Sequence, residues 1–217
     1  MTITNEDNMK LMARYPDRYF DLAIVDPPYG LDLANMNMGI GKSKKASKIQ
    51  NRKWKPKNWD TATPDIKYFK ELFRLSKNQI IWGGNYFNLP SFKHYIIWDK
   101  EIPNGLSFAD CELAWTSFST AVRQFKFKWA GFLQGYGTAN KEERIHPTQK
   151  PIRLYEWLLD NYAKEGDKIL DTHLGSGSIA LACHNRGFDL DGWEIDEEYY
   201  NNAVKRLKTH QQQLTIF

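Results

Sequence analysis

The sequence contains little cysteine and no long apolar run. Only two of its 217 residues are cysteines, Cys111 and Cys183. Two cysteines are too few for a disulfide framework and lack metal-ligand spacing, so we expect both to be reduced thiols. No apolar run is long enough to span a bilayer, and the polar, acidic residues 1–7 lack the core of a signal peptide. These absences predict a soluble cytoplasmic protein without a metal site.

The composition is that of an ordinary folded domain. A chain of 217 residues can bury a sizeable core, and its hydrophobic content of 41% argues against global disorder. We find neither an internal repeat nor a clear linker, so we expect one domain over residues 1–217. The net charge of +4 is mildly basic, which is compatible with a nucleic-acid partner.

The first motif follows a short apolar run. Residues 22–25 read Leu-Ala-Ile-Val, which is typical of a buried strand, and Asp26-Pro27-Pro28-Tyr29 comes directly after them. Two prolines exclude both a helix and a sheet ladder, so the chain must turn outward. The turn would present a carboxylate, free backbone carbonyls and an aromatic ring where open α/β sheets bind ligands. An incidental Pro-Pro turn would also account for these four residues.

Two basic stretches are candidates for contact with nucleic acid. Residues 39–58 carry Lys and Arg interleaved with tryptophan, including Lys53, Trp54 and Lys55. They form either a solvated loop or a mobile flap that contacts phosphates and stacks on bases. In residues 121–129, apolar side chains alternate with basic ones and predict a half-exposed strand. Its basic face, Arg123, Lys126 and Lys128, would contact nucleic acid or protect a sheet edge.

The remaining pattern predicts alternating strands and helices. A helix starting with Thr63 as its cap should run through residues 69–73. Further strands are expected over residues 79–82, 95–98, 113–115, 168–171 and 189–194. Further helices are expected over residues 152–162, 178–186 and 197–208.

A nucleotide-type unit lies in residues 168–194. It reads as a strand, a glycine turn, a helix and a second strand that ends in Glu194. Gly175 and Gly177 would let a ligand approach the backbone, and Glu194 stands where such folds bind ribose hydroxyls. The spacing also satisfies the dinucleotide fingerprint, which keeps a nicotinamide oxidoreductase open. Only one helix follows Glu194, so the remaining strands must come from the amino-terminal half and the sheet must be circularly permuted.

These motifs, in this order, resemble those of the S-adenosylmethionine-dependent DNA amino-methyltransferases. The resemblance is to the class in which the catalytic tetrapeptide precedes the cofactor glycines. The matching segments cover nearly the whole chain: Asp26-Pro27-Pro28-Tyr29, residues 80–85, residues 95–99, the His146-Pro147-Thr148-Gln149-Lys150-Pro151 turn, Asp171 with Gly175-Ser176-Gly177, and Glu194. One departure is His173, where the family usually has phenylalanine.

The resemblance implies a fold, a reaction and a set of site residues. The fold would be a single-domain, mostly parallel Rossmann-like α/β sheet. Asp26, Pro27, Pro28 and Tyr29 would act on a flipped-out adenine of double-stranded DNA and direct a methyl group to its N6 amine. The implied S-adenosylmethionine site comprises Asp7, His146, Thr148, Asp171, Gly175, Ser176, Gly177 and Glu194.

The resemblance also leaves alternatives and partners to test. Cytosine N4 remains possible, although relatives acting on it more often carry serine in place of Asp26. RNA or protein glutamine as substrate, and an inactive DNA-binding module, are further alternatives. Residues 116–145 leave room for only a short target-recognition insertion, which suggests a relaxed site or a homodimer. The last five residues, including Gln213, Leu214 and Phe217, resemble a sliding-clamp-binding peptide and are not expected to continue the last helix, and a tail that packs on the protein's own core is the alternative.

Overall fold

The structure is a computed structural model. It describes residues 1–32, 55, 57–91, 94–102, 109–130, 133–135 and 141–214. Within these ranges no helix has the length and apolar character needed to cross a membrane. Most of the basic segment predicted over residues 39–58 lies outside the described residues.

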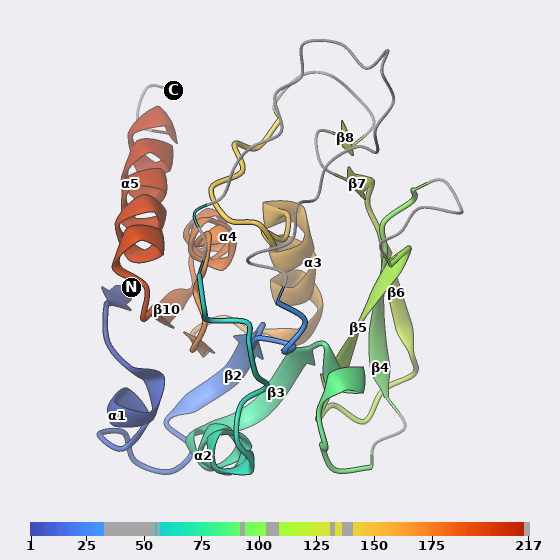
Figure 1. The fold of residues 1–217 in the computed structure, drawn as a ribbon, viewed down its shortest axis with the longest axis vertical. Coiled ribbons are helices and arrows are strands. Elements are labelled where there is room, and N and C mark those ends of the chain that lie inside the picture. The colour runs from blue at the N-terminus through green and yellow to red at the C-terminus, as the bar shows by residue number, and fades with distance from the viewer. Residues whose placement is uncertain are drawn as a thin grey trace.

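A mixed sheet forms the centre of the fold (Figure 1). In the described part of the chain its strand order is β1-β10-β9-β2-β3-β5-β4-β6. All neighbouring pairs are parallel except the two that involve β5, so the expected mostly parallel α/β sheet is confirmed. The strands are β1 (Thr2–Thr4), β2 (Phe20–Val25), β3 (Ser76–Trp82), β4 (Tyr95–Asp99), β5 (Cys111–Thr116), β6 (Arg123–Lys126), β9 (Lys168–Asp171) and β10 (Asp189–Trp193).

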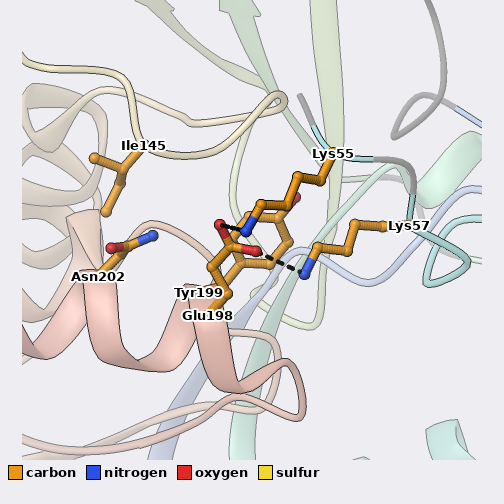
Figure 2. Close-up of a pocket in the computed structure, with 6 residues that line it drawn as sticks. All are labelled: Lys55, Lys57, Ile145, Glu198, Tyr199 and Asn202. Carbon is orange, nitrogen blue, oxygen red and sulfur yellow. Dashed lines mark ion pairs between the residues drawn. The ribbon is translucent and has the colours of Figure 1, made fainter. Parts of the chain in front are cut away.

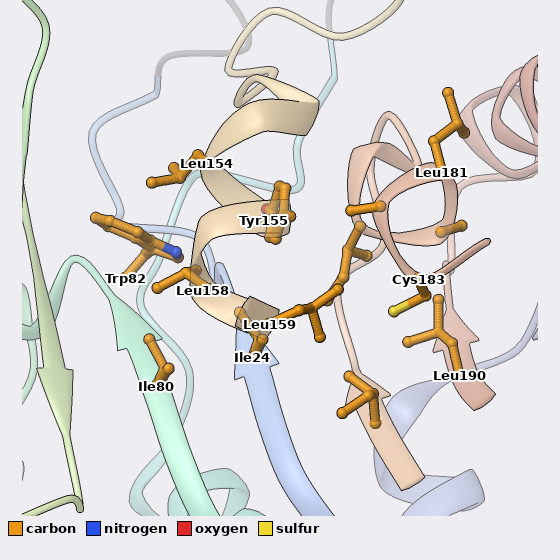
Figure 3. Packing of buried hydrophobic residues seen from close by; sticks show 14 of the residues in the cluster. Ile24, Ile80, Trp82, Leu154, Tyr155, Leu158, Leu159, Leu181, Cys183 and Leu190 are labelled. Carbon is orange, nitrogen blue, oxygen red and sulfur yellow. The ribbon is translucent and has the colours of Figure 1, made fainter. Parts of the chain in front are cut away.

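Helices cover both faces of this sheet (Figure 1). On one face α1 (Asn8–Met12) and α2 (Ile66–Leu75) pack into a core with Phe20, Ile81 and Trp193. On the other face α3 (Ile152–Tyr162) and α4 (Ser178–Arg186) pack against the sheet, and α5 (Glu197–Leu214) contacts α4. Figure 3 shows this second core, in which Leu158 and Leu159 of α3 meet the apolar strand residues. The central strands β2 and β9 are therefore buried on both faces, as their apolar sequences require.

Most predicted elements are present with small shifts at their ends. The helices over residues 152–162 and 178–186 and the strand over 168–171 match residue for residue. Three predictions were wrong in their bounds. The cap of α2 is Asp65, which accepts a hydrogen bond from Lys67 N, and not Thr63. The strand expected over residues 121–129 is β6 alone, followed by a short hairpin of β7 (Trp129–Ala130) and β8 (Leu133–Gln134).

The third correction concerns the carboxyl-terminal peptide. Helix α5 runs to Leu214, so Gln213 and Leu214 continue the helix, contrary to the expectation from sequence. The helix extends because no proline or glycine interrupts residues 197–214. Phe217 lies outside the described residues.

The parallel strands bring the predicted motifs to one edge of the sheet. β9 lies between β2 and β10, and these three strands run in the same direction. The tetrapeptide after β2, the glycine turn after β9 and Glu194 after β10 therefore meet at the carboxyl ends of adjacent strands. This is the edge at which open α/β sheets bind ligands.

Candidate active site

A cavity of about 300 Å³ lies at the carboxyl edge of the strands. Asp26 and Pro28 from the turn after β2 line it together with residues from the last third of the chain. The predicted residues in its wall are Asp26, Pro28, His146, Thr148, Gly175, Ser176 and Glu194. Segments that are distant in the sequence thus contribute to one site.

Asp26 is held by hydrogen bonds to both carboxylate oxygens. Its Oδ1 accepts a hydrogen bond of 2.6 Å from the Tyr29 hydroxyl, and its Oδ2 accepts one from the Lys150 ammonium. Burial raises the pKa of Asp26 above its ordinary value, and the positive charge of Lys150 opposes that rise. The carboxylate is thus fixed at the cavity wall.

The turn that carries Tyr29 is held by hydrogen bonds to Asp60. Asp60, which is buried, accepts hydrogen bonds from the backbone nitrogens of Tyr29 and Gly30 at 2.8 and 2.9 Å. The Tyr29 ring, predicted to stack on a target base, lies stacked on the Tyr86 ring at a centroid distance of 4.9 Å. Neither Tyr29 nor Pro27 lines the cavity.

Lys150 and Glu112 are site residues that the sequence reasoning missed. The Lys150 side chain is only 3% exposed, and its ammonium lies 3.1 Å from Glu112 of β5 as well as beside Asp26. Burial would lower the pKa of Lys150, but the Asp26 and Glu112 carboxylates raise it above its ordinary value. Burial alone would raise the pKa of Glu112, but Lys150 and Lys100 bring it down to about 2. Lys150 belongs to the recognised turn 146–151, which was the one available signal.

Glu194, just after β10, also lines the cavity. Its Oε2 accepts a hydrogen bond of 2.8 Å from Gly175 N, and its Oε1 accepts one of 2.9 Å from Asp196 N. Burial raises the pKa of Glu194, while these backbone donors favour its ionised form. With the Ile195 backbone as a third donor, three of about four lone-pair sites of the carboxylate are used, which leaves capacity for a hydroxyl of a ligand.

His146 is a neutral aromatic wall of the cavity. Its ring lies between those of Trp59 and Tyr199, at centroid distances of 5.1 and 4.3 Å, and its Nδ1 accepts a hydrogen bond from Thr148 N. Burial lowers the pKa of His146 to about 3, so the imidazole is uncharged at neutral pH. The cavity therefore has aromatic and uncharged surface on this side.

His173, at the position where the family has phenylalanine, also lines the cavity. Its Nε2 lies 3.2 Å from Asn8 Nδ2 and its Nδ1 lies 2.9 Å from Thr172 Oγ1. Burial lowers the pKa of His173 to about 4, so this imidazole is also neutral at neutral pH. The ring meets Tyr68 edge to face, as an aromatic side chain would.

Three predicted cofactor residues do not line the cavity. Asp7 caps α1 by accepting a hydrogen bond from Lys10 N, while its neighbours Glu6 and Asn8 line the cavity instead. Asp171 is buried and accepts a hydrogen bond from His173 N, and burial raises the pKa of Asp171 to about 8. Gly177, with a φ of 69°, begins α4 against Ala203.

The predicted DNA-contacting residues lie apart from one another. Lys53 and Trp54 lie outside the described residues. Lys55 forms a 3.2 Å ion pair with Glu198 of α5 beside a smaller cavity of about 180 Å³, where Lys57 also reaches Glu198 (Figure 2). On β6, Arg123 and Lys126 are exposed, and Lys128 just beyond is half-buried.

Comparison with known proteins agrees with this architecture. The N6/N4 family model, described as DNA methylase, matches residues 115–205, from β5 into α5. The type II methyltransferase M2.DpnII of Streptococcus pneumoniae is 25% identical over 96% of this chain and 90% of its own length. M.HpaI of Haemophilus parainfluenzae, another type II methyltransferase, is 24% identical over 92% of this chain and 71% of its own length.

Solved structures share the fold. The structure of the M1.HpyAVI-SAM complex has a TM-score of 0.55 at 19% identity and covers 95% of this chain and 99% of its own. The cytosine-N4-specific PvuII DNA methyltransferase has a TM-score of 0.57 at 10% identity, with 97% and 91% covered. The family model over residues 115–205 and the sequence relatives thus relate this chain to the N6/N4 DNA methylases, and the solved structures share its fold.

Proposed function

We propose that this protein transfers a methyl group from S-adenosylmethionine to the N6 amine of adenine in double-stranded DNA. The observation that supports this best is the shared cavity. Asp26 and Glu194 both line it, although they lie near opposite ends of the chain. One site can then hold a nucleoside cofactor and a target base side by side.

The chain's residues fit an S-adenosylmethionine cofactor. Glu194 has oxygen capacity for the ribose hydroxyls, and Gly175 (φ 51°) and Ser176 let the backbone approach the methionine part. Neutral His146 and His173 add no positive charge beside a sulfonium. When bound, the cofactor supplies an electrophilic methyl group. Of the other predicted cofactor residues, Asp7, Asp171 and Gly177 would act on the shape of the site and not by direct contact.

Asp26 and the Pro27 carbonyl would activate the target amine. The lone pair of an adenine amine is delocalised into the ring, so the nitrogen is a weak nucleophile. Accepting both N–H hydrogens draws the nitrogen toward a tetrahedral form with its lone pair aimed at the methyl group. The base must leave the duplex to reach Asp26, at a cost of a few kcal/mol. Tyr29 is the residue proposed to stack on it, together with its partner Tyr86.

The choice of adenine rests on the resemblance and not on the cavity. Asp at the head of the tetrapeptide is the form that the resembling family uses for N6 of adenine. Cytosine N4 is the alternative, because the same two hydrogen-bond acceptors would serve its amine and PvuII DNA methyltransferase, which shares the fold, is cytosine-N4-specific.

DNA contacts are proposed for two segments. Exposed Arg123 and Lys126, with Lys128, would contact phosphates from a recognition insertion over residues 116–145 of a single-domain chain. The segment 39–58, with Lys53, Trp54 and Lys55, would contact DNA from the other side, and Lys55 would then exchange Glu198 for phosphate. Because this recognition insertion is small, we also propose that the protein is a homodimer. Light scattering of the purified protein would reveal or refute the dimer.

The motif order supports a circularly permuted arrangement, in which the catalytic half precedes the cofactor half. The carboxyl-terminal peptide is proposed as a sliding-clamp ligand through Gln213, Leu214 and Phe217. Since Gln213 and Leu214 are helical, the last turn of α5 would have to unwind on binding. Clamp binding that survives deletion of residues 213–217 would refute this proposal.

The methylated base can be mapped directly. DNA from cells that express the protein would be analysed by single-molecule sequencing and by mass spectrometry of its nucleosides, beside an Asp26→Ala control. We expect N6-methyladenine in one sequence context and none in the control. N4-methylcytosine would keep the mechanism and overturn the base. Unmodified DNA from cells with folded protein would overturn DNA methylation as the function.

A further inference from the structure

A partly buried row of alternating charges leads away from Asp26. Lys150 contacts Asp26, Glu112 lies 3.1 Å from the same ammonium, and Lys100 lies 2.7 Å from the other oxygen of Glu112. The side chains of Lys150, Lys100 and Glu112 are 3%, 14% and 22% exposed. They come from the loop before α3, the end of β4 and β5, so the fold and not local sequence brings them together.

Such a row is costly to build, and packing alone does not require it. Removing a charge from water is unfavourable, and a hydrophobic replacement of a buried ion pair is often as stable. Apolar side chains in this place would satisfy the core, since Trp82 and Trp98 already lie beside the two ammonium groups. Within the row, Lys150 and Glu112 are the two members whose charges act on Asp26.

We propose that Lys150 and Glu112 are positioning residues for methyl transfer: Lys150 orients and holds the Asp26 carboxylate, and Glu112 shares the ammonium so that Asp26 stays free to accept the hydrogens of the target amine. This inference rests on the proposed function. Asp26 Oδ2 accepts from Lys150 and Oδ1 from Tyr29, and a carboxylate has about four lone-pair sites, so room remains for an incoming amine. Without Glu112, the whole ammonium charge would be directed at Asp26.

Lys150 and Glu112 shift the pKa of Asp26 in opposite directions. Lys150 stabilises the ionised carboxylate and lowers the pKa of Asp26, whereas the negative charge of Glu112 raises it. Asp26 must be ionised to accept amine hydrogens, so turnover is lost as the pH falls through its pKa. The other titratable groups that face Asp26 are Tyr29 in its own turn, Tyr68 of α2, Tyr155 of α3 and Asp171 of β9.

The pH dependence of kcat separates positioning from a structural role. In Lys150→Met we expect the acid limb of the kcat profile to move up by about one unit or more, and kcat at neutral pH to fall about 10²-fold. In Glu112→Gln we expect the acid limb to move down while the KM for DNA rises. Lys150→Arg should return the limb toward the wild-type position, because the charge is restored.

Lys100→Met is the matched control, because it removes the same charge from the far side of Glu112. Its acid limb should stay in place. Assays would use tritiated S-adenosylmethionine and unmethylated bacterial DNA, with urea unfolding to verify that each variant is folded. If Lys150→Met does not fold, Glu112→Gln and Lys150→Arg still carry the test.

The inference and the proposed function fail in different ways. If wild-type protein methylates DNA but the limbs of Lys150→Met and Glu112→Gln stay in place or move in the same direction, the inference is wrong and the function stands. If wild-type protein does not methylate DNA, the function is wrong. The pKa of Asp26 can then still be followed by carbon NMR of labelled aspartate in the free protein, where equal titration in all variants would overturn the inference as well.

Discussion

At the scale of the residue, Tyr29 and Gly83 are fitted to each other. Gly83 has a φ of 69°, and a Cβ built on it would lie 2.2 Å from Cε1 of the Tyr29 ring. The glycine therefore serves two needs, a left-handed backbone and space for an aromatic ring. The ring in turn places the hydroxyl that donates to Asp26.

Gly83→Ala should displace the Tyr29 ring and disturb Asp26. We expect kcat for methylation to fall about tenfold or more, because the hydroxyl loses its place. Gly187→Ala is the matched control: its φ of 74° carries the same left-handed strain of about 1–2 kcal/mol, but no atom of the described residues lies within 4 Å of its added Cβ. Urea unfolding and kcat would be measured for both. Equal kcat values in the two variants would contradict the assignment of Tyr29.

At the scale of the element, α2 depends on a cap that its sequence did not single out. Thr63, Pro64 and Asp65 are all typical of a helix start, and proline in the first turn favoured Thr63 as the cap. In the structure, Asp65 Oδ1 accepts a hydrogen bond of 2.8 Å from Lys67 N. Which of two capping residues is used depends on where the helix must lie to bury Phe69 and Leu72.

Asp65→Ala should destabilise the protein by about 1 kcal/mol, because it leaves an N–H at the start of α2 without its acceptor. Thr63→Ala removes the alternative cap and should change the free energy of unfolding much less. Urea unfolding at neutral pH compares the two variants. A larger loss of unfolding free energy in Thr63→Ala than in Asp65→Ala would show that Thr63 is the cap, as predicted from sequence.

Local signals predicted the elements better than they predicted the contacts. Pro151 and the apolar spacing of residues 152–162 determine α3, and the short turn signals determine β9 and α4. β1 and α1 were not predicted, because three- and five-residue elements carry no periodicity and β1 depends on pairing with β10. The contact of Lys150 with Asp26 was invisible for the same reason, since only the assembled sheet brings these residues together.

At the scale of the whole molecule, three buried groups set opposing pH dependences of stability. His146 and His173 have folded pKa values lowered by burial to about 3 and about 4, from 6.5. The unfolded chain binds protons there that the folded chain does not, so stability falls as the pH drops below 6.5. Burial raises the pKa of Asp171 from 3.8 to about 8. The contribution of Asp171 to the free energy of unfolding therefore falls as the pH rises from the lower to the higher of these values.

His173→Phe should reduce the loss of stability in acid. The variant no longer has the imidazole that must gain a proton on unfolding, so its free energy of unfolding should drop by about 1–2 kcal/mol less than that of wild type between neutral pH and pH ~5. Urea unfolding at the two pH values measures this difference within each protein, which removes the cost of losing the Asn8 contact. An unchanged pH dependence of stability would show that His173 has the same pKa in the folded and in the unfolded chain.

The position of β9 in the sheet has a consequence for biosynthesis. β2 pairs with β3 on one side and with β9 on the other, and among the described strands β1 pairs with β10 alone. While the chain leaves the ribosome, β2 and β3 can associate early, but one edge of β2 must wait until residues 168–171 are made. Until then, the β2 edge that will pair with β9 has unpaired backbone groups. Such an edge can associate with other chains, so we expect it to be the part of the nascent sheet that most needs a chaperone.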